Sequence, residues 1–281
     1  LEKIGSKSII DQSTPIKEIS CSKLEYYQKN KKFQIHFKEK NSNNEMGRVL
    51  LNSSLEKNLD DLININKSII INNSPIQSYQ YKTSTKKILL NDNKEVLTNL
   101  LIITDKNSDL IKENFKKNLL KKELNQTSIV MNVKTKTDGH AYQFFTKKGA
   151  LAFLPIHDNL ASIIWSLDNS TEELNYNLDL ISNKINKIFE PLTGMIEILD
   201  IQKYKLNFEY AKKIISKSIV LIGDAAHSLH PIAGQGLNLS IKDIVALKLK
   251  IEHFKYLGYS LGNQIILNEF QNERQADNAI F

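Results

Sequence analysis

The chain has 281 residues, of which 41% are hydrophobic and 25% are charged, so it is long enough to bury one large core or two smaller ones. The formal charge is +7, but the basic residues are spread through every segment and arginine occurs only at Arg48 and Arg274. Proteins that bind nucleic acid usually concentrate their basic residues, and membrane spans need a long uninterrupted apolar run that is missing here, so neither class is predicted.

The single cysteine and the first residues of the sequence set the expected compartment. Cys21 has no partner for an internal disulfide, which favours a reducing compartment, and we interpret it as a packing residue. The opening residues LEKIGSKSII lack the charged and apolar segments of a signal peptide. We therefore predict a cytoplasmic protein, whose dispersed positive charge also favours loose contact with an anionic membrane surface.

The first hundred residues predict a mixture of helices and strands. Residues 1–12 resemble the end of a helix, and 15–38 predict two strands joined by a turn, because apolar and polar residues alternate on either side of QKNKK. Apolar residues from 49 to 62 follow helical spacing, with Arg48 near the start of that helix. Residues 66–104 predict four short strands, the last of them (LLIIT) buried and parallel to a neighbour.

The middle of the chain predicts a second sheet and a helix that follows it. Residues 137–167 contain three strand-like runs, separated at Gly139, at Gly149 and at the segment PIHDN. Residues 171–190 carry leucine and isoleucine every three or four positions, behind a Thr/Glu start that resembles a capping box. We expect an amphipathic helix there.

Residues 217–251 predict a buried strand, a turn and a helix. The run Ile219–Ile222 is apolar and Gly223 closes it, so the end of the strand places Asp224 at a crevice. Helical spacing resumes at Leu237. The strand is therefore followed by an acidic residue and a loop that leads into a helix.

The loop itself is rich in residues that let a ligand approach the backbone. Gly234, Gln235 and Gly236 lie at the expected helix N-terminus, where free N–H groups attract negative charge, and Pro231 fixes the direction of the chain before it. This combination suits a flat cofactor with hydroxyl groups and a carbonyl that becomes anionic, as a reduced flavin has.

Two histidines in the same segment, His227 and His230, form an H-x-x-H pair. Zinc needs three or four converging ligands, and neither a second cysteine pair nor a helical H-E-x-x-H is present. We therefore predict no metal site.

Three segments carry a resemblance to a known family: HPIAGQGLNLS, GALAFLPIHDNLASIIW and FQNERQADNAIF. In order and spacing they resemble the flavin-dependent aromatic hydroxylases, and within them the 2-polyprenylphenol hydroxylases of ubiquinone biosynthesis. The resemblance implies a mixed α/β (α+β) fold, in which an incomplete Rossmann-like FAD-binding domain is interleaved with a β-sheet substrate domain. It assigns 1–12, 41–120 and 211–252 to the first domain, 13–40 and 121–210 to the second, and 253–281 to the start of a C-terminal helical segment.

The same resemblance implies which residues bind the cofactor and the substrate. Asp224 would hold the ribityl chain, the backbone from Gly234 to Asn238 would face the flavin ring, and Arg48 would reach the phosphate and ribityl region. The full implied cofactor set is Arg48, Asp105, Gly223, Asp224, Pro231, Gly234, Gln235, Gly236, Leu237 and Asn238. Phe153, Pro155 and Trp165 are candidate substrate residues, although core packing explains them equally well, and no side chain is assigned to catalysis.

Two departures from the family pattern concern the cofactor. Lys106 stands where the family has glycine, in a turn that favours positive φ, and Lys112 stands where arginine is usual. The family's G-x-G-x-x-G segment, which holds the pyrophosphate, is not among these residues, and the simplest interpretation is a partial chain.

By resemblance, the complete protein would bind FAD, use NAD(P)H and O₂, and hydroxylate an aromatic or polyprenylated phenol, with peripheral contact to the inner membrane or with a quinone-biosynthesis complex. Two alternatives stay open at this point: a flavin-dependent reductase of an isoprenoid, and a degenerate, non-catalytic subunit of a biosynthetic complex.

Overall fold

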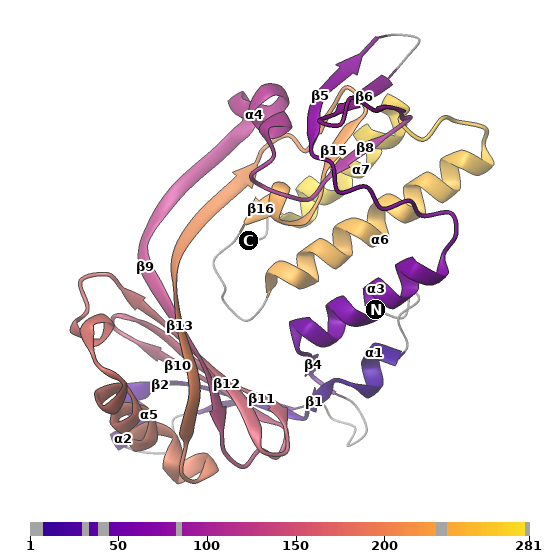
Figure 1. The fold of residues 1–281 in the computed structure, drawn as a ribbon. Helices are drawn as coiled ribbons and strands as arrows, with labels where there is room; N and C mark the ends of the chain where they lie inside the picture. Colours follow the sequence, from indigo (N-terminus) through magenta and orange to yellow (C-terminus); the bar gives the residue numbers. More distant parts are fainter. Residues whose placement is uncertain (1–7, 30–33, 39–44, 83–85, 229–234, 279–281) are drawn as a thin grey trace. The chain divides into compact units, whose positions relative to one another are not determined.

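The computed structural model of the chain divides into two compact units. Unit 1 comprises residues 1–66 and 124–206, and unit 2 comprises 67–123 and 207–281. The structure describes residues 8–29, 34–38, 45–82, 86–228 and 235–278. Figure 1 labels the helices and strands of both units.

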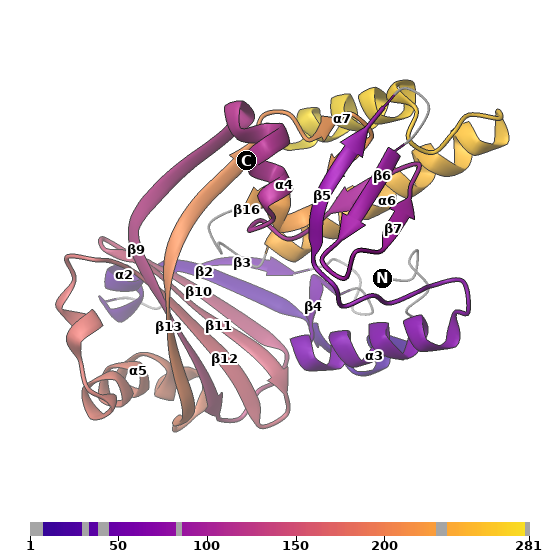
Figure 2. The ribbon, with the colours of Figure 1, turned by 45° about the horizontal axis from the view of Figure 1, so that its top comes forward.

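Unit 1 is built on a mixed sheet. Its neighbouring strands run in the order β13-β9-β12-β11-β10-β2-β3, and Figure 2 shows them side by side. Strands β10, β11 and β12 pair antiparallel in sequence, whereas β10 and β2 are parallel. The strands are β1 (Thr14–Ile16), β2 (Glu18–Lys23), β3 (Ile35–Lys38), β4 (Gly47–Val49), β9 (Leu119–Lys134), β10 (His140–Thr146), β11 (Gly149–His157), β12 (Leu160–Asp168) and β13 (Glu197–Ala211).

Helix α5 (Leu178–Thr193) covers one face of this sheet (Figure 1). Its residues Ile181, Ile185, Ile188 and Phe189 are buried in one cluster with alternate residues of β9 to β12, as period-two strands and a 3.6-period helix require. The remaining helices of the unit are α1 (Ser8–Asp11), α2 (Leu24–Lys29), α3 (Asn52–Ile65) and the 3₁₀ helix η3 (Glu172–Asn175).

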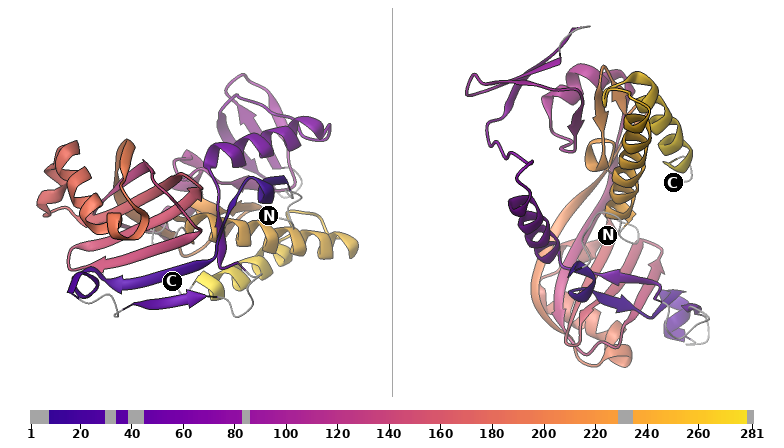
Figure 3. Two further views of the ribbon diagram at one scale, coloured as in Figure 1. Left: turned by 90° about the horizontal axis from the view of Figure 1, so that it is seen from below. Right: turned by 90° about the vertical axis from the view of Figure 1, so that its right-hand side faces the viewer.

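Unit 2 packs a small sheet against two long helices. Strand β15 pairs with β14 and, in parallel, with β8, and helices α6 and α7 lie side by side (Figure 3). Its strands are β5 (Ile76–Tyr81), β6 (Lys86–Leu90), β7 (Glu95–Leu97), β8 (Leu101–Ile103), β14 (Ile215–Ser216), β15 (Ile219–Leu221) and β16 (His227–Ser228). Its helices are α4 (Asp109–Phe115), η2 (Lys116–Asn118), η4 (Gly223–Ala225), α6 (Gln235–Tyr256) and α7 (Gln264–Asn278).

The strands β10 to β12, the parallel pair β8 and β15, and helix α6 confirm the predicted elements. Four local predictions are wrong. Residues 24–29 form helix α2 within the predicted strand–turn–strand, because Tyr27 packs its ring against Phe144 at 5.0 Å. Residues 47–49 form β4, paired with β1, so the helix begins only at Asn52.

The other two errors concern a strand and a helix start. Residues 67–75 contain no strand, and Ile70 in the middle of that apolar run is 90% exposed. Helix α5 begins after Asn177, whose side chain accepts the Leu180 N–H, whereas the Thr171 start belongs to the 3₁₀ helix before it.

The compact units differ from the predicted functional domains at two segments. Residues 1–12 and 41–66 belong to unit 1 with the large sheet, whereas the family pattern assigns them to the FAD-binding domain. Pairing of β4 with β1 accounts for the place of residues 41–66 in unit 1. The functional domain boundaries stay a prediction.

Candidate cofactor site

The candidate site lies where two parallel strands of unit 2 end. Leu221 of β15 is in register with Ile103 of β8, and the next N–H, of Ile222, donates to the carbonyl oxygen of Ile103 at 3.0 Å. The chain therefore leaves both strands at the same edge of the sheet, which is where open α/β sheets bind ligands. Asp105 and Asp224 follow these two strand ends.

Gly223 forms the turn at the end of β15, and its conformation requires glycine. Its φ is +61°, and a Cβ at this position would lie 3.0 Å from the Ser240 Oγ of helix α6. Ser240 in turn donates to the carbonyl oxygen of Gly236 at 2.9 Å. The turn is therefore packed directly against the first turns of α6.

A buried carboxylate holds this turn from behind. Asp243 of α6 accepts the Gly223 N–H at 3.2 Å on Oδ2, which also lies 2.7 Å from His227 Nε2. Its other oxygen, Oδ1, accepts the Arg274 Nε–H of helix α7 at 2.7 Å. The residues Asp243, His227 and Arg274 are each 1% exposed, so the turn is held in place by a buried network.

The electrostatics of this network favour an ionised Asp243. Burial by itself raises the pKa of the Asp243 carboxyl, but the hydrogen bonds and charges of His227, then Arg274 and the Gly223 N–H, outweigh it and hold that pKa below its ordinary value. His227 Nδ1 is buried and has no hydrogen-bond partner within the part of the chain that the structure describes. One polar atom beside the turn is thus available to a ligand.

Asp224 itself points to the solvent side of the turn. Its side chain is exposed, in contrast to its buried neighbours Gly223 and Ala225. Among the described residues no hydrogen bond to its carboxylate is present. The carboxylate is therefore presented at the strand edge as an acceptor for hydroxyl groups.

The N-terminus of α6 supplies the second half of the predicted site. The helix begins at Gln235, and no heavy atom of the described residues lies within 4 Å of a Cβ built on Gly236. Leu237 is 50% exposed and Asn238 is exposed as well. Pro231 and Gly234, together with His230 and the side chain of Gln235, lie outside the described residues.

The turn after β8, which contains Asp105 and Lys106, has no residue with positive φ. Asp105 accepts the Asn107 N–H at 2.9 Å through its side chain, and Lys106 is not among the residues with positive φ, which in the described chain are Asn93, Lys217, Ser218 and five glycines. The expected conflict between a lysine and this turn is therefore relieved by a negative φ. Lys112 pairs with Asp109 at 2.7 Å on the surface of α4.

Arg48 lies in strand β4 of unit 1 rather than in a helix, where it ties β4 to the chain around α1. Its guanidinium contacts Glu45 through two atoms at 2.5 Å and donates to the carbonyl oxygen of Ile10 at 2.6 Å. The hydrogen bond to Glu45 raises the pKa of Arg48. These contacts give Arg48 a structural role, and its cofactor role stays a prediction.

The candidate substrate residues lie in the core of unit 1. Phe153 is 0% and Trp165 4% exposed, both within the cluster that α5 covers, and the Phe153 ring is 5.4 Å from that of Phe189. Pro155 is buried on the same face of β11. Core packing accounts for all three, whereas their role in binding substrate stays a prediction. Cys21 is half-buried, and burial raises the pKa of its thiol, in keeping with packing.

Three observations in unit 2 fit the ribityl and ring portion of FAD. They are the exposed Asp224 carboxylate, the unpartnered buried Nδ1 of His227 and the open space at Gly236 beside a helix N-terminus. A hydroxyl-bearing chain needs an acceptor, and an anionic ring edge needs N–H donors. The donor set therefore matches this part of the cofactor.

Sequence reasoning missed the two residues that hold the site together, Asp243 and Arg274. Asp243 occupies the apolar face of α6, between buried Leu239 and buried Leu247. An acidic residue at i+4 on an apolar face needs a buried partner, and this was the available signal. Arg274 lies in the segment FQNERQADNAIF, but nothing in its local sequence indicates a buried partner.

Comparison with known proteins identifies the family. Residues 112–275, more than half of the chain, match the family model described as FAD binding domain. The chain therefore belongs to the FAD binding domain family. The matched residues contain the turn at Gly223, Asp243 and Arg274.

The curated relatives include hydroxylases of ubiquinone synthesis. The chain is 32% identical to the 3-demethoxyubiquinol 3-hydroxylase of Escherichia coli over 55% of its own length and 41% of that protein. It is 26% identical to the ubiquinone hydroxylase UbiL of Rhodospirillum rubrum, covering 68% and 46% of the two chains. Human ubiquinone biosynthesis monooxygenase COQ6 is 24% identical, with 68% and 49% covered. The chain spans about half the length of these relatives or less.

Solved structures show the same fold. PqsL of Pseudomonas aeruginosa, described as a probable FAD-dependent monooxygenase, superposes with a TM-score of 0.79 at 15% identity, covering 97% of this chain and 78% of that one. HpxO of Klebsiella pneumoniae, solved with FAD and uric acid, gives 0.66 at 12% identity, covering 97% and 71%. The mixed α/β fold predicted by the resemblance is thereby confirmed.

Proposed function

We propose that the protein containing this chain is an FAD-dependent monooxygenase that hydroxylates an aromatic ring of a polyprenylphenol in ubiquinone biosynthesis, with NAD(P)H and O₂ as co-substrates. The observation that carries the proposal is the Gly223–Asp224 turn, which lies within the matched FAD binding domain and is anchored by a buried carboxylate. The names of the relatives supply the substrate class.

Within this proposal each part of the site has one task. FAD supplies the redox chemistry with O₂ when it is bound. Asp224 accepts hydrogen bonds from the ribityl hydroxyls, and the backbone N–H groups at the start of α6 stabilise negative charge on the ring edge. The contacts of Gly223 with Asp243 and Ser240 fix the position of the Asp224 carboxylate relative to the start of α6. The binding surface for the cofactor is therefore formed before FAD binds.

The proposal extends to the protein's surroundings. A polyprenylated substrate resides in the bilayer, and the formal charge of +7 favours peripheral contact with anionic lipids at the cytoplasmic side of the inner membrane. No helix among the described residues has the length and apolar character needed to cross a bilayer. A quinone-biosynthesis complex is a further proposed partner, by analogy with the relatives' pathway.

The test is flavin retention and product analysis on the protein made from its whole gene. We expect a yellow protein whose NAD(P)H oxidation rises with a polyprenylphenol and whose product contains one added oxygen from O₂. A product with two added hydrogens would replace the proposal by an isoprenoid reductase, and a stable, colourless protein that binds partners would replace it by a non-catalytic subunit.

Substitution of Asp224 tests the site itself. Asp224→Asn keeps the shape but removes the charged acceptor, so the dissociation constant for FAD should rise roughly 10- to 100-fold, as expected for loss of a hydrogen bond to a charged group. Asp61→Asn is the matched control, because Asp61 is an exposed acidic residue of α3 in the other unit. Equal FAD affinity in both variants would contradict the assignment of Asp224.

A further inference from the structure

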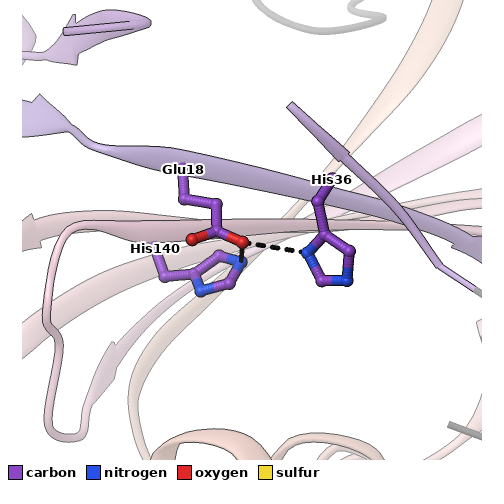
Figure 4. Close-up of side chains that lie close together, drawn as sticks. All are labelled: Glu18, His36 and His140. Carbon is purple, nitrogen blue, oxygen red and sulfur yellow. Dashed lines mark hydrogen bonds and ion pairs between the residues drawn. The ribbon is translucent and has the colours of Figure 1, made fainter. Parts of the chain in front are cut away.

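A cluster of three metal-binding side chains lies on the sheet of unit 1, outside the candidate cofactor site. Glu18 of β2, His36 of β3 and His140 of β10 bring one ligand atom each to within 4.8 Å of one another, and Figure 4 shows their side chains pointing toward a common point. The three strands are neighbours, with His140 in register with Glu18. Strand pairing therefore places the cluster, without help from any loop.

The distances within the cluster are close to those of a coordinated ion. Glu18 Oε1 lies 2.9 Å from His36 Nδ1 and 3.9 Å from His140 Nε2. Zinc ligands at about 2.0–2.1 Å in a tetrahedral arrangement lie roughly 3.3 Å apart. Shifts of about half an ångström, within the reach of χ rotation, bring both contacts to that separation.

The ring of His140 is already oriented for coordination. It stacks on Tyr142 with a centroid distance of 4.3 Å and an interplanar angle of 12°, and Tyr142 belongs to the buried core. The conformational entropy of this side chain is therefore lost when the protein folds, and not when the metal ion binds.

The Ser20 hydroxyl marks the point where the two rings converge. Ser20 Oγ lies 2.8 Å from His36 Nδ1 and 2.7 Å from His140 Nε2. In the metal-free protein this hydroxyl donates to one ring and accepts from the other, which satisfies the cluster. Rotation of the hydroxyl about χ1 removes its contacts with both nitrogen atoms, which leaves the Glu18–His36 hydrogen bond as the contact that an ion would replace.

Access and charge both permit binding of a cation. The His36 side chain is 48% exposed, while those of Glu18 and His140 are 25% and 19% exposed, so an ion reaches the cluster from solvent and retains water in its remaining positions. Lys38 Nζ lies 3.8 Å from Glu18 Oε2, on the oxygen that faces away from His36. That contact engages Oε2, whereas Oε1 faces His36 Nδ1 at 2.9 Å, and an ion bound between them would replace this hydrogen bond.

We propose that Glu18, His36 and His140 bind one Zn²⁺ ion, with water completing the coordination, and that the ion fastens the edge strand β3 to the sheet. Two imidazoles and one carboxylate with an open position are a ligand set that Zn²⁺ takes in proteins. All four residues of β3 are exposed, so the strand has little apolar burial of its own. A bond from His36 to an ion that is also bound by β2 and β10 would stabilise the position of β3, which has little apolar packing to hold it.

The experiment is equilibrium dialysis of the whole purified protein, stripped with a chelator, against Zn²⁺ and against Co²⁺ as a spectroscopic probe. We expect one equivalent of Zn²⁺ and a Co²⁺ absorption spectrum of a four- or five-coordinate nitrogen–oxygen site. His140→Asn and Glu18→Gln should weaken Zn²⁺ binding by more than about 100-fold, since residues that merely orient ligands already account for about 10–100-fold. Hydrogen exchange of residues 35–38 should slow when Zn²⁺ is added.

Two controls keep the test specific. His157→Ala removes an exposed histidine of the same unit that lies outside the cluster and should leave binding unchanged, and Ser20→Ala removes the competing hydroxyl and should bind Zn²⁺ at least as tightly as wild type. Circular dichroism of each variant shows that it is folded. Failure of the wild type to take up one equivalent, equal uptake by folded His140→Asn, or loss of uptake in Ser20→Ala would overturn the proposal.

Discussion

The cores of the two units differ in the kinds of side chain that they bury. Among the described residues, the buried polar side chains of unit 1 are serines and threonines, and its core is apolar, with Phe144, Phe153 and Phe189 fully buried. In the described part of unit 2 the largest fully buried side chain is Arg274, which joins buried Asp243 and His227.

The difference separates a core that provides stability from one that positions a turn. Apolar packing tolerates substitution in proportion to the volume lost, whereas a buried ion pair contributes little net stability but costs much when one partner is removed. The charged network of unit 2 contacts the Gly223 backbone directly. It is therefore explained by the geometry it imposes on the candidate site rather than by stability alone.

Breaking the charged network should give the largest effect. Arg274→Met leaves Asp243 buried without its guanidinium partner, so the free energy of unfolding should fall by about 3–5 kcal/mol. Denaturant unfolding measures this, and FAD affinity should fall in parallel because the turn loses its anchor. An Arg274→Met protein as stable as wild type would show that the network is not the organising element of unit 2.

Removing apolar volume from unit 1 should give a comparable or smaller loss. Ile185→Ala in α5, where the side chain is 0% exposed, should cost about 2–5 kcal/mol. Because the site residues of unit 2 are untouched, FAD affinity measured well below the unfolding temperature should stay unchanged. A loss of FAD affinity as large as the loss of stability would contradict the proposal that the core of unit 1 provides stability while the network of unit 2 positions the site.

The free energy of unfolding should fall at acid pH, over the pH range in which Asp243 becomes protonated. Its folded pKa is lowered from 3.8, so the network contributes fully above pH 3.8, and that contribution is lost as the pH falls through the folded value. Acid unfolding curves should therefore be less steep for Asp243→Asn than for wild type in that range. Identical curves would contradict an ionised Asp243.

The smallest effect belongs to His140 in unit 1. Its folded pKa is lowered from 6.5 by burial, so the unfolded chain binds the proton more tightly and stability decreases as the pH falls below 6.5 toward the folded value. Unfolding measured between pH 7 and 5 without metal should show this slope, and His140→Asn should remove it. Persistence of the slope in the variant would assign it to another group.

Local sequence patterns predicted the elements whose pairing partners are near in the chain. Strands β10 to β12 and helix α6 follow from alternation and helical spacing. The errors at residues 47–49 and 67–75 arose because an apolar run is compatible with several structures, and pairing with a distant segment determines which one forms. Residues 47–49 form β4 because they pair with β1, whereas residues 67–75 do not pair with any described strand.

The turn and the helix start of the candidate site were predictable from the sequence, but the residues that support them were not. Asp224 and the helix start follow from a strand, a turn and glycines that are contiguous in sequence. Asp243 and Arg274 lie on two different helices and meet only after packing, so no local pattern reports their contact. The same holds for the Glu18, His36 and His140 cluster, whose members come from three strands.

The strands β9 and β13 have a consequence for dissecting the protein. The division between the units falls inside both of them, at residues 123/124 and 206/207, and the two strands are neighbours in the sheet. A truncation that isolates either unit must sever both strands within their length, so each half loses part of two hydrogen-bonded strands. Genetic complementation by separately expressed halves should therefore fail.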